Sequence, residues 1–180
     1  IGNFGYIGTG GGATNPNYND FWQYDPVTNT WNIKAYFALV RVNATAFTIG
    51  NKGYIGTGQA YINNTLVYYN DFWEYDPVLD AWTQKANVGG PPRFNASSFS
   101  LGGKGYIGTG NDSFSYLNDF WEYDDMLNSW VQKANFTGGA RESASGLSIQ
   151  CKGYFGLGYD GSLKNDFWEY NPTANNWTQR

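Results

Sequence analysis

The sequence GYIGTG occupies Gly5–Gly10, and it returns unchanged at Gly53–Gly58 and at Gly105–Gly110; a fourth copy, GYFGLG, occupies Gly153–Gly158. A phosphate-binding loop would need a Lys and a Ser or Thr directly after its last glycine, at the start of a helix, and no copy has them. Copies at intervals of roughly 50 residues are instead typical of a repeat protein. We expect each set of glycines to end a strand where neighbouring strands crowd together.

Two further motifs repeat in step with the glycine motif. The aromatic motif NDFWQYDP begins at Asn19, and its relatives begin at Asn70, Asn118 and Asn165. Each is followed by a tryptophan, and three arginine-led segments precede the later glycine motifs, at Arg41, Arg93 and Arg141. The order is always arginine segment, glycine motif, aromatic motif, tryptophan.

Each repeat predicts four short strands. The arginine segments alternate small or apolar residues with polar ones, and the aromatic motif is apolar on both faces of a strand, so both faces should be buried. The Asp-Pro that follows it predicts a turn, and no segment has helical periodicity with caps. We therefore expect one all-β domain over 1–180, an arc of four four-stranded β-propeller blades with units at roughly 1–40, 41–92, 93–140 and 141–180. The innermost strands should be 42–50, 94–101 and 142–149.

The succession GYIGTG, NDFWEYDP, tryptophan resembles the kelch repeat, including the propeller of galactose-oxidase-like proteins, in the variant of secreted and surface-attached bacterial proteins. This chain has Gly-Thr-Gly where that family often has adjacent glycines. The resemblance implies a ring of more blades than four, so we expect an arc of a larger ring; a self-closed four-bladed ring and completion by an oligomer stay open. It also implies an extracellular or cell-surface location.

The composition excludes several classes of function. The net charge is −4 and no basic stripe is visible, which argues against nucleic acid as a partner. No apolar run is long enough for insertion into a membrane. The chain has no His and a single Cys, so we expect no metal site, no cofactor and no histidine-assisted nucleophile, and the copper chemistry of galactose oxidase is excluded.

Arg41, Arg93 and Arg141 are candidate ligand residues because they stand just before the innermost strands, close to the expected central channel. A guanidinium there could bind the carboxylate of an acidic sugar or an acidic peptide. The alternative is a structural arginine that bonds carbonyl groups of adjacent blades, and its recurrence in three repeats favours that role.

Four aspartates open the third strand of their repeats: Asp20, Asp71, Asp119 and Asp166. Identical repetition is unlike a catalytic carboxylate pair, whose members differ in environment. We expect hydrogen bonds at turns or strand ends.

The segments between the glycine and aromatic motifs differ from repeat to repeat, and variable loops on a constant frame are where binding residues concentrate. They are rich in aromatic residues, and five tyrosines are our candidate ligand contacts: Tyr61, Tyr68, Tyr69, Tyr116 and Tyr159. The alternative is that these rings fold back on their own blades. Two asparagines in these segments, Asn63 and Asn111, lie in N-x-S/T sequons and are candidate glycosylation sites.

The sequence thus predicts a non-catalytic module that binds a protein or glycan partner through its variable loops. One alternative is a sugar-active enzyme of the mutarotase kind, for which Glu142 is the first acid to test, since it has no counterpart in the other repeats. The other is an architectural module of a surface adhesin or filament.

Overall fold

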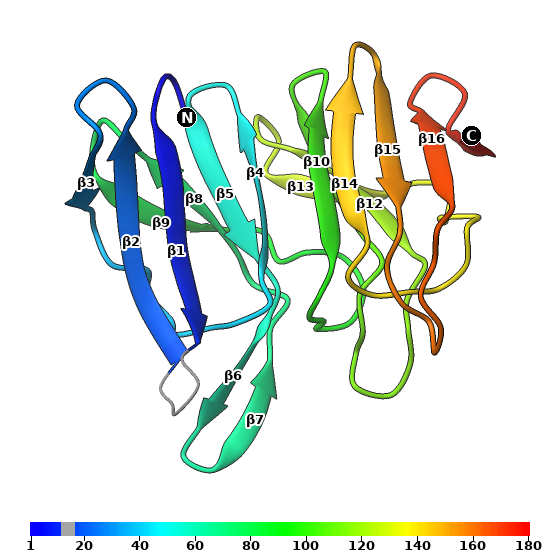
Figure 1. The fold of residues 1–180 in the computed structure, drawn as a ribbon, viewed down its shortest axis with the longest axis horizontal. Coiled ribbons are helices and arrows are strands. Elements are labelled where there is room, and N and C mark those ends of the chain that lie inside the picture. Colours follow the sequence, from blue (N-terminus) through cyan, green and yellow to red (C-terminus); the bar gives the residue numbers. More distant parts are fainter. Residues whose placement is uncertain (12–16) are drawn as a thin grey trace.

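The computed structural model describes residues 1–11 and 17–180, and these contain strands and no helix (Figure 1). Part of the first variable segment, residues 12–16, lies outside the described residues. With no helix in the described part, nothing there has the length and apolarity of a membrane-crossing helix.

The strands form four antiparallel sheets side by side, the blades of a β-propeller-like arc (Figure 1). Blade 1 consists of β1 (Gly5–Gly11), β2 (Asn17–Asp25) and β3 (Thr30–Ile33). Blade 2 consists of β4 (Thr45–Ile49), β5 (Lys52–Gly56), β8 (Phe72–Asp76) and β9 (Ala81–Lys85). Blade 3 consists of β10 (Ser97–Leu101), β11 (Lys104–Gly108), β12 (Phe120–Asp124) and β13 (Ser129–Gln132). Blade 4 consists of β14 (Ser145–Ile149), β15 (Lys152–Gly156), β16 (Phe167–Asn171) and β17 (Asn176–Gln179).

The all-β fold and the arc of four blades confirm the prediction, except that blade 1 has three strands among the described residues where four were predicted. The arc is open. Blades 1 and 4 lie at its opposite ends (Figure 1), so the described residues do not close a four-bladed ring. Backbone hydrogen bonds join the residues just before successive inner strands, from the Asn95 N–H to the Asn43 carbonyl and from the Ser143 N–H to the Asn95 carbonyl.

The inner strands begin three residues later than predicted. At the predicted start of the inner strand of blade 2, Val42 forms an isolated bridge with Gln59, and Asn43 then turns to a φ of 58°. This left-handed residue interrupts the ladder before β4 begins at Thr45. Blades 3 and 4 repeat the interruption, at Asn95 and Ser143.

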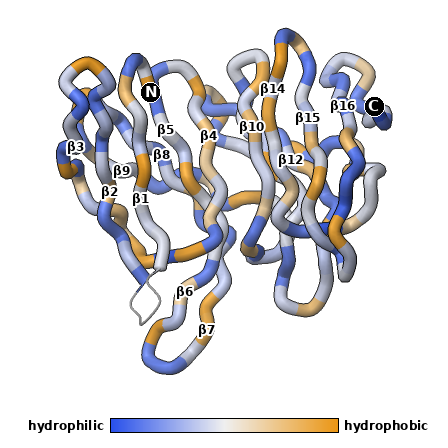
Figure 2. Tube along the Cα trace, viewed as in Figure 1, coloured by the Kyte–Doolittle hydropathy of each residue, from blue (hydrophilic) through white to orange (hydrophobic). Residues whose placement is uncertain are grey.

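The variable segment of blade 2, predicted as a loop, is a hairpin. Strands β6 (Gln59–Ile62) and β7 (Thr65–Tyr68) pair with each other and project beyond the blades (Figure 1). Its strands carry hydrophobic segments at this exposed site (Figure 2).

Aromatic rings hold neighbouring blades together, as their repetition predicted. The ring of Phe120 in blade 3 packs edge-on against Tyr170 and Trp177 of blade 4, with centroids 4.8 and 5.0 Å away. The Trp177 indole also donates to the Ala134 carbonyl at 3.1 Å, beyond the outer strand of blade 3. Trp82 and Trp130 make the same bond to Ala35 and Ala86. Each aromatic pair adds about 0.5–1.5 kcal/mol beyond the area it buries, so these contacts fix the angle between blades.

Candidate functional site

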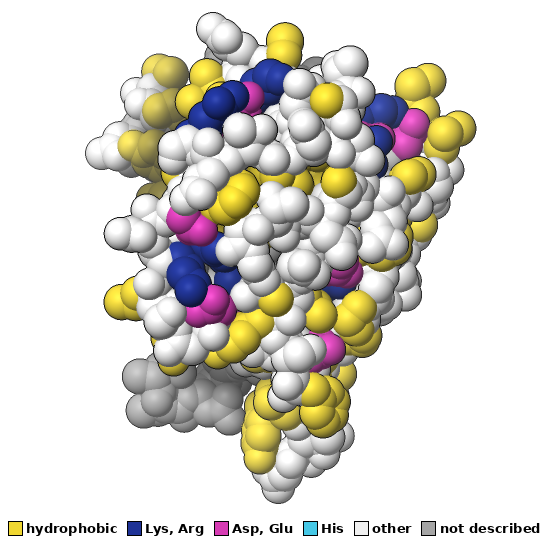
Figure 3. All heavy atoms as spheres, turned by 90° about the vertical axis from the view of Figure 1, so that its right-hand side faces the viewer, with side chains coloured by type: hydrophobic (Ala, Val, Ile, Leu, Met, Phe, Trp, Pro, Cys, Tyr) yellow, Lys and Arg dark blue, Asp and Glu magenta, His cyan; other side chains and the backbone are white. Residues whose placement is uncertain are grey.

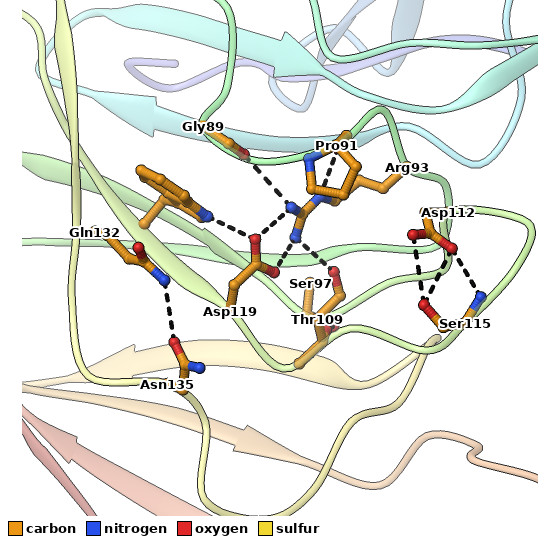
Figure 4. Close-up of polar contacts among 11 residues, drawn as sticks. Gly89, Pro91, Arg93, Ser97, Thr109, Asp112, Ser115, Asp119, Gln132 and Asn135 are labelled. Carbon is orange, nitrogen blue, oxygen red and sulfur yellow. Dashed lines mark hydrogen bonds and ion pairs between the residues drawn. The ribbon is translucent and has the colours of Figure 1, made fainter.

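The three repeat arginines are buried, and each binds an aspartate of its own blade. In blade 2 the Arg41 guanidinium is 0% exposed, and its Nη1 and Nη2 donate to the two carboxylate oxygens of Asp71 at 2.8 and 2.7 Å. Arg93 binds Asp119 in the same way (Figure 4), and Arg141 binds Asp166. The hydrogen bonds from Arg141 hold the pKa of Asp166 below its ordinary value.

The arginines also explain the glycine motif. Arg41 Nη1 donates to the Thr57 carbonyl at 2.8 Å, and Thr57 has a φ of 63°. This left-handed residue, the threonine of Gly-Thr-Gly, turns its carbonyl toward the guanidinium at the end of β5. Its counterparts Thr109 and Leu157 also have positive φ and accept from Arg93 and Arg141. In these three blades the turned carbonyls supply acceptors that a buried guanidinium needs.

The same arginines join one blade to the next through their backbone. The Gly58 N–H, the last of the motif in blade 2, donates to the Arg93 carbonyl at 2.7 Å, and Gly110 donates likewise to Arg141. Each arginine thus bonds the preceding blade by its backbone and its own blade by its side chain. The guanidinium groups of Arg41, Arg93 and Arg141 have no exposed surface with which to hold a ligand carboxylate, so the geometry supports the structural role over the ligand-binding one.

The five candidate tyrosines lie in different settings. Tyr69 folds back on the frame, where its ring lies 4.6 Å from the guanidinium carbon of Arg41. Tyr68 stacks on Phe94 with centroids 5.6 Å apart, and both rings are half-buried. Tyr61 on β6 is 55% exposed. The remaining two, Tyr116 and Tyr159, form an edge-to-face pair 6.1 Å apart across the boundary between blades 3 and 4.

Beside this pair the structure places an acid. Glu142 and Tyr159 exchange two backbone hydrogen bonds of 2.9 Å, and Asn95 Nδ2 donates to Glu142 Oε2 at 3.3 Å. We call Asn95, Tyr116, Glu142 and Tyr159 the mouth cluster, because they lie where the inner strands β10 and β14 begin. Desolvation raises the pKa of Tyr116, and neighbouring acidic groups, Tyr159 and Glu142 among them, raise it further.

Sequence reasoning identified Glu142, Tyr116 and Tyr159 separately but did not bring them together, and it missed Asn95. The signal for Glu142 was its lack of a counterpart at Val42 and Phe94. Asn95 has a counterpart in Asn43, so repetition concealed its contact with the acid.

Every basic side chain of the described residues is paired with a carboxylate, whereas the carboxylate of Glu142 is not paired with a basic group. All 11 lysines and arginines lie within 4.0 Å of a carboxylate. Figure 3 shows one face, on which basic side chains lie beside acidic ones. Glu142 has no such ion pair within the described part of the chain. The exposed chemistry near the mouth cluster is therefore acidic and aromatic.

The two sequon asparagines differ in setting. Asn63 is exposed in the turn between β6 and β7. Asn111 is half-buried; its backbone bridges Phe94 and Tyr116, and its side-chain oxygen accepts from the Ser113 N–H at 2.7 Å. Glycosylation at either stays a prediction, and Asn63 is the more accessible.

No protein-family model matches the chain, and no curated protein matches it. Among solved structures it is similar to that of YjhT, with a TM-score of 0.81 and 17% sequence identity. The match covers 100% of this chain and 63% of that one, so the chain spans less than two thirds of that protein's length. At this identity the likeness shows the fold alone.

Proposed function

We propose that this chain is a non-catalytic kelch-type binding module that recognises a protein partner, or a glycan, through the face that carries the variable segments. The observation that carries the proposal is a set of exposed aromatic side chains on a braced frame. Tyr61 and Tyr159 are exposed on this face, and Phe114 lies in the loop that leads to Tyr116. Exposed aromatic anchors on a rigid frame supply contact area at low entropic cost.

The frame beneath these loops is rigid because the arginine–aspartate pairs lie at their bases. Asp119 directly precedes β12, the third strand of blade 3, where the loop bearing Tyr116 ends, and its carboxylate is bound by Arg93. A buried bidentate pair restricts both partners, so the loop ends are pre-organised for binding.

The charge distribution bears on the chemistry of the partner. A carboxylate ligand, the class expected for the arginines, would find every lysine and arginine of the described residues already beside a carboxylate. The mouth cluster offers the Glu142 carboxylate and two tyrosine rings, which suit an ammonium or guanidinium group. Between the two partner classes, this favours a protein that presents a lysine or arginine side chain.

The two alternatives make different demands. A mutarotase-like enzyme would need an acid together with arginines that are free to bind the sugar. Arg141, the arginine next to Glu142, is instead bound to Asp166. An architectural module would need no mouth cluster. The proposed location outside the cell or on its surface is supported by the kelch resemblance alone.

The test is a combined peptide and glycan array probed with the intact protein and with Tyr159→Ala. We expect binding to basic peptides that Tyr159→Ala weakens. Met126→Ala is the matched control, because Met126 is exposed in the β12–β13 turn at the opposite end of the strands. Silence on both arrays would favour the architectural alternative, and faster anomer exchange of a sugar panel by NMR would favour the enzyme.

A further inference from the structure

The hairpin of β6 and β7 is apolar on both faces, and one of these faces is exposed. On the buried face Ala60 has no exposed surface. The next residue, Tyr61, points to the other face and is 55% exposed, and its cross-strand partner Leu66 is 42% exposed. A hairpin with one buried face ordinarily carries polar side chains on the other. Here the whole segment 59–70 has no charged residue, and Figure 3, which views the molecule from the side of blade 4, shows hydrophobic side chains on the hairpin at its lower end.

The ladder places Tyr61 and Leu66 directly opposite each other and close together. The backbone N–H and carbonyl of Gln59 are both bonded to Val42, at 2.9 and 2.8 Å, so Gln59 forms a non-hydrogen-bonded pair with Tyr68 of β7. The two kinds of pair alternate along an antiparallel ladder, and Tyr61–Leu66 is therefore also a non-hydrogen-bonded pair. Side chains in such pairs approach each other more closely, so these two form one continuous apolar surface.

The turn of the hairpin fixes this arrangement. Asn63 and Asn64 connect the paired residues Ile62 and Thr65, with φ angles of 49° and 61°. Two successive left-handed residues are typical of a type I′ turn, whose twist matches that of the strands it joins. The exposed apolar pair is thus held in one register, and little order has to be gained when a partner binds.

The exposed face of the hairpin continues to the mouth cluster. Tyr68 lies on the same face of β7 as Leu66, and its ring stacks on Phe94 of blade 3 with centroids 5.6 Å apart. The residue after Phe94 is Asn95, which donates to Glu142 Oε2 at 3.3 Å. An apolar surface therefore leads directly to the carboxylate that has no ion pair among the described residues. We call it the hairpin corner, and it consists of Tyr61, Leu66, Tyr68 and Phe94.

The chemistry of the hairpin corner favours a protein segment as its occupant. Sugar hydroxyl groups laid against Leu66 would lose hydrogen bonds to water and gain none. A large apolar side chain would bury its surface there at no such cost. The neighbouring Glu142 carboxylate complements a positive charge, so the surface as a whole matches a segment that carries an apolar and a basic side chain.

We propose, resting on the proposed function, that the segment whose lysine or arginine enters the mouth cluster also seats a large apolar side chain on the hairpin corner, against Tyr61 and Leu66. The basic side chain supplies the charge-assisted contact with Glu142. The apolar side chain supplies buried area and decides which basic segments bind, since a basic segment without it leaves the corner uncovered.

The first test is selection of a random dodecapeptide library, displayed on phage, with the intact protein. We expect the enriched peptides to share a lysine or arginine and, at a fixed spacing from it, a Leu, Ile, Met, Phe or Trp. Enrichment of basic residues without the apolar residue would overturn this inference and leave the proposed function standing. Enriched peptides without a basic residue, or no enrichment, would overturn both.

The second test is a fluorescence anisotropy titration of the most enriched peptide, labelled, against Leu66→Thr. Threonine keeps a residue that favours strands and removes most of the apolar surface, so we expect about tenfold weaker binding. Leu79→Thr is the matched control and should bind as the wild-type protein does, because Leu79 is 72% exposed in the β8–β9 turn at the opposite end of the blade. Equal binding by Leu66→Thr and the wild-type protein would overturn the proposal.

A double-mutant cycle distinguishes a direct contact from a distorted hairpin. Replacing the apolar residue of the peptide with serine should remove the effect of Leu66→Thr and preserve that of Glu142→Gln. Replacing the basic residue of the peptide with glutamine should do the reverse. An effect of Leu66→Thr that is equally large with the serine peptide would overturn the proposal, because the loss would then come from the shape of the hairpin and not from the contact.

Discussion

Arg93 and Asp119 face each other in the interior of blade 3, with each terminal nitrogen of the guanidinium donating to one carboxylate oxygen (Figure 4). Asp119 also accepts the indole N–H of Trp121 at 2.7 Å, and Arg93 donates to the Thr109 carbonyl at 3.1 Å. One ion pair therefore ties together the inner-strand entrance, the glycine motif and the aromatic motif.

Removing one partner of this pair should destabilise the fold strongly. We expect Asp119→Ala to lower the free energy of unfolding by about 3–5 kcal/mol, because it leaves a buried guanidinium without its counter-ion. Asp20→Ala is the matched control, since the one side-chain partner of Asp20 among the described residues is Trp22, and the variant should lose about 1 kcal/mol, the worth of one hydrogen bond. Urea unfolding followed by tryptophan fluorescence measures both, and equal losses would contradict the role given to the arginine.

Acid should destabilise the protein through the same pairs. The Arg141 hydrogen bonds lower the pKa of Asp166 from an ordinary value of 3.8. The stabilisation is present above pH 3.8 and is lost as the pH falls through the lower, folded-state pKa, because the unfolded state binds the proton more readily. Unfolding free energies measured between pH 5 and pH 2 should fall toward acid, and the fall should be shallower in Asp166→Asn.

Two equivalent threonines should respond oppositely to the same substitution. The buried Thr57 hydroxyl has no hydrogen-bond partner among the described residues, whereas the Thr109 hydroxyl donates to the Ser97 hydroxyl at 3.3 Å. Thr57→Val should stabilise by about 1 kcal/mol and Thr109→Val should destabilise by about as much, since valine keeps the shape and removes the hydroxyl. Thermal unfolding compares the two; a loss of stability in Thr57→Val would contradict the assignment.

The aromatic motif should matter more inside the arc than at its end. Phe120 is 0% exposed between blades 3 and 4, whereas Phe167, its counterpart in blade 4, is 38% exposed and stacks on Tyr154 of its own blade. Phe120→Ala should cost about 3–5 kcal/mol of unfolding free energy and Phe167→Ala clearly less, because only the first opens a cavity. Denaturant midpoints of the two variants measure the difference.

Most of the fold could be predicted because the same local sequence patterns recur in each blade. The alternation in the arginine segments and the aromatic residues on both faces of the third strand specify strand and burial together. The late start of β4 could not be predicted, because a left-handed asparagine at Asn43 depends on the bridge that Val42 makes with Gln59.

The site was harder to predict than the fold. Arginine and aspartate recur in every complete repeat, but their side chains lie about 25–30 positions apart in sequence and meet only when the blade forms. The mouth cluster involves residues of two blades, and the contact of Asn95 with Glu142 has no local sequence signal.

The charge of Glu142 should decide how tightly the mouth cluster binds a basic partner. If the mouth cluster receives a lysine or arginine of a partner, Glu142→Gln should weaken binding of the array's best basic peptide about tenfold while keeping the hydrogen bond from Asn95. Raising the salt concentration should weaken peptide binding by the wild-type protein more than binding by the variant, since salt screens an exposed ion pair. Asp125→Asn is the control, because Asp125 lies in the β12–β13 turn, away from the variable segments. Equal affinity of Glu142→Gln and the wild-type protein at low salt would remove the acid from the site, and a loss of salt sensitivity in Asp125→Asn would assign the effect to the net charge of the protein.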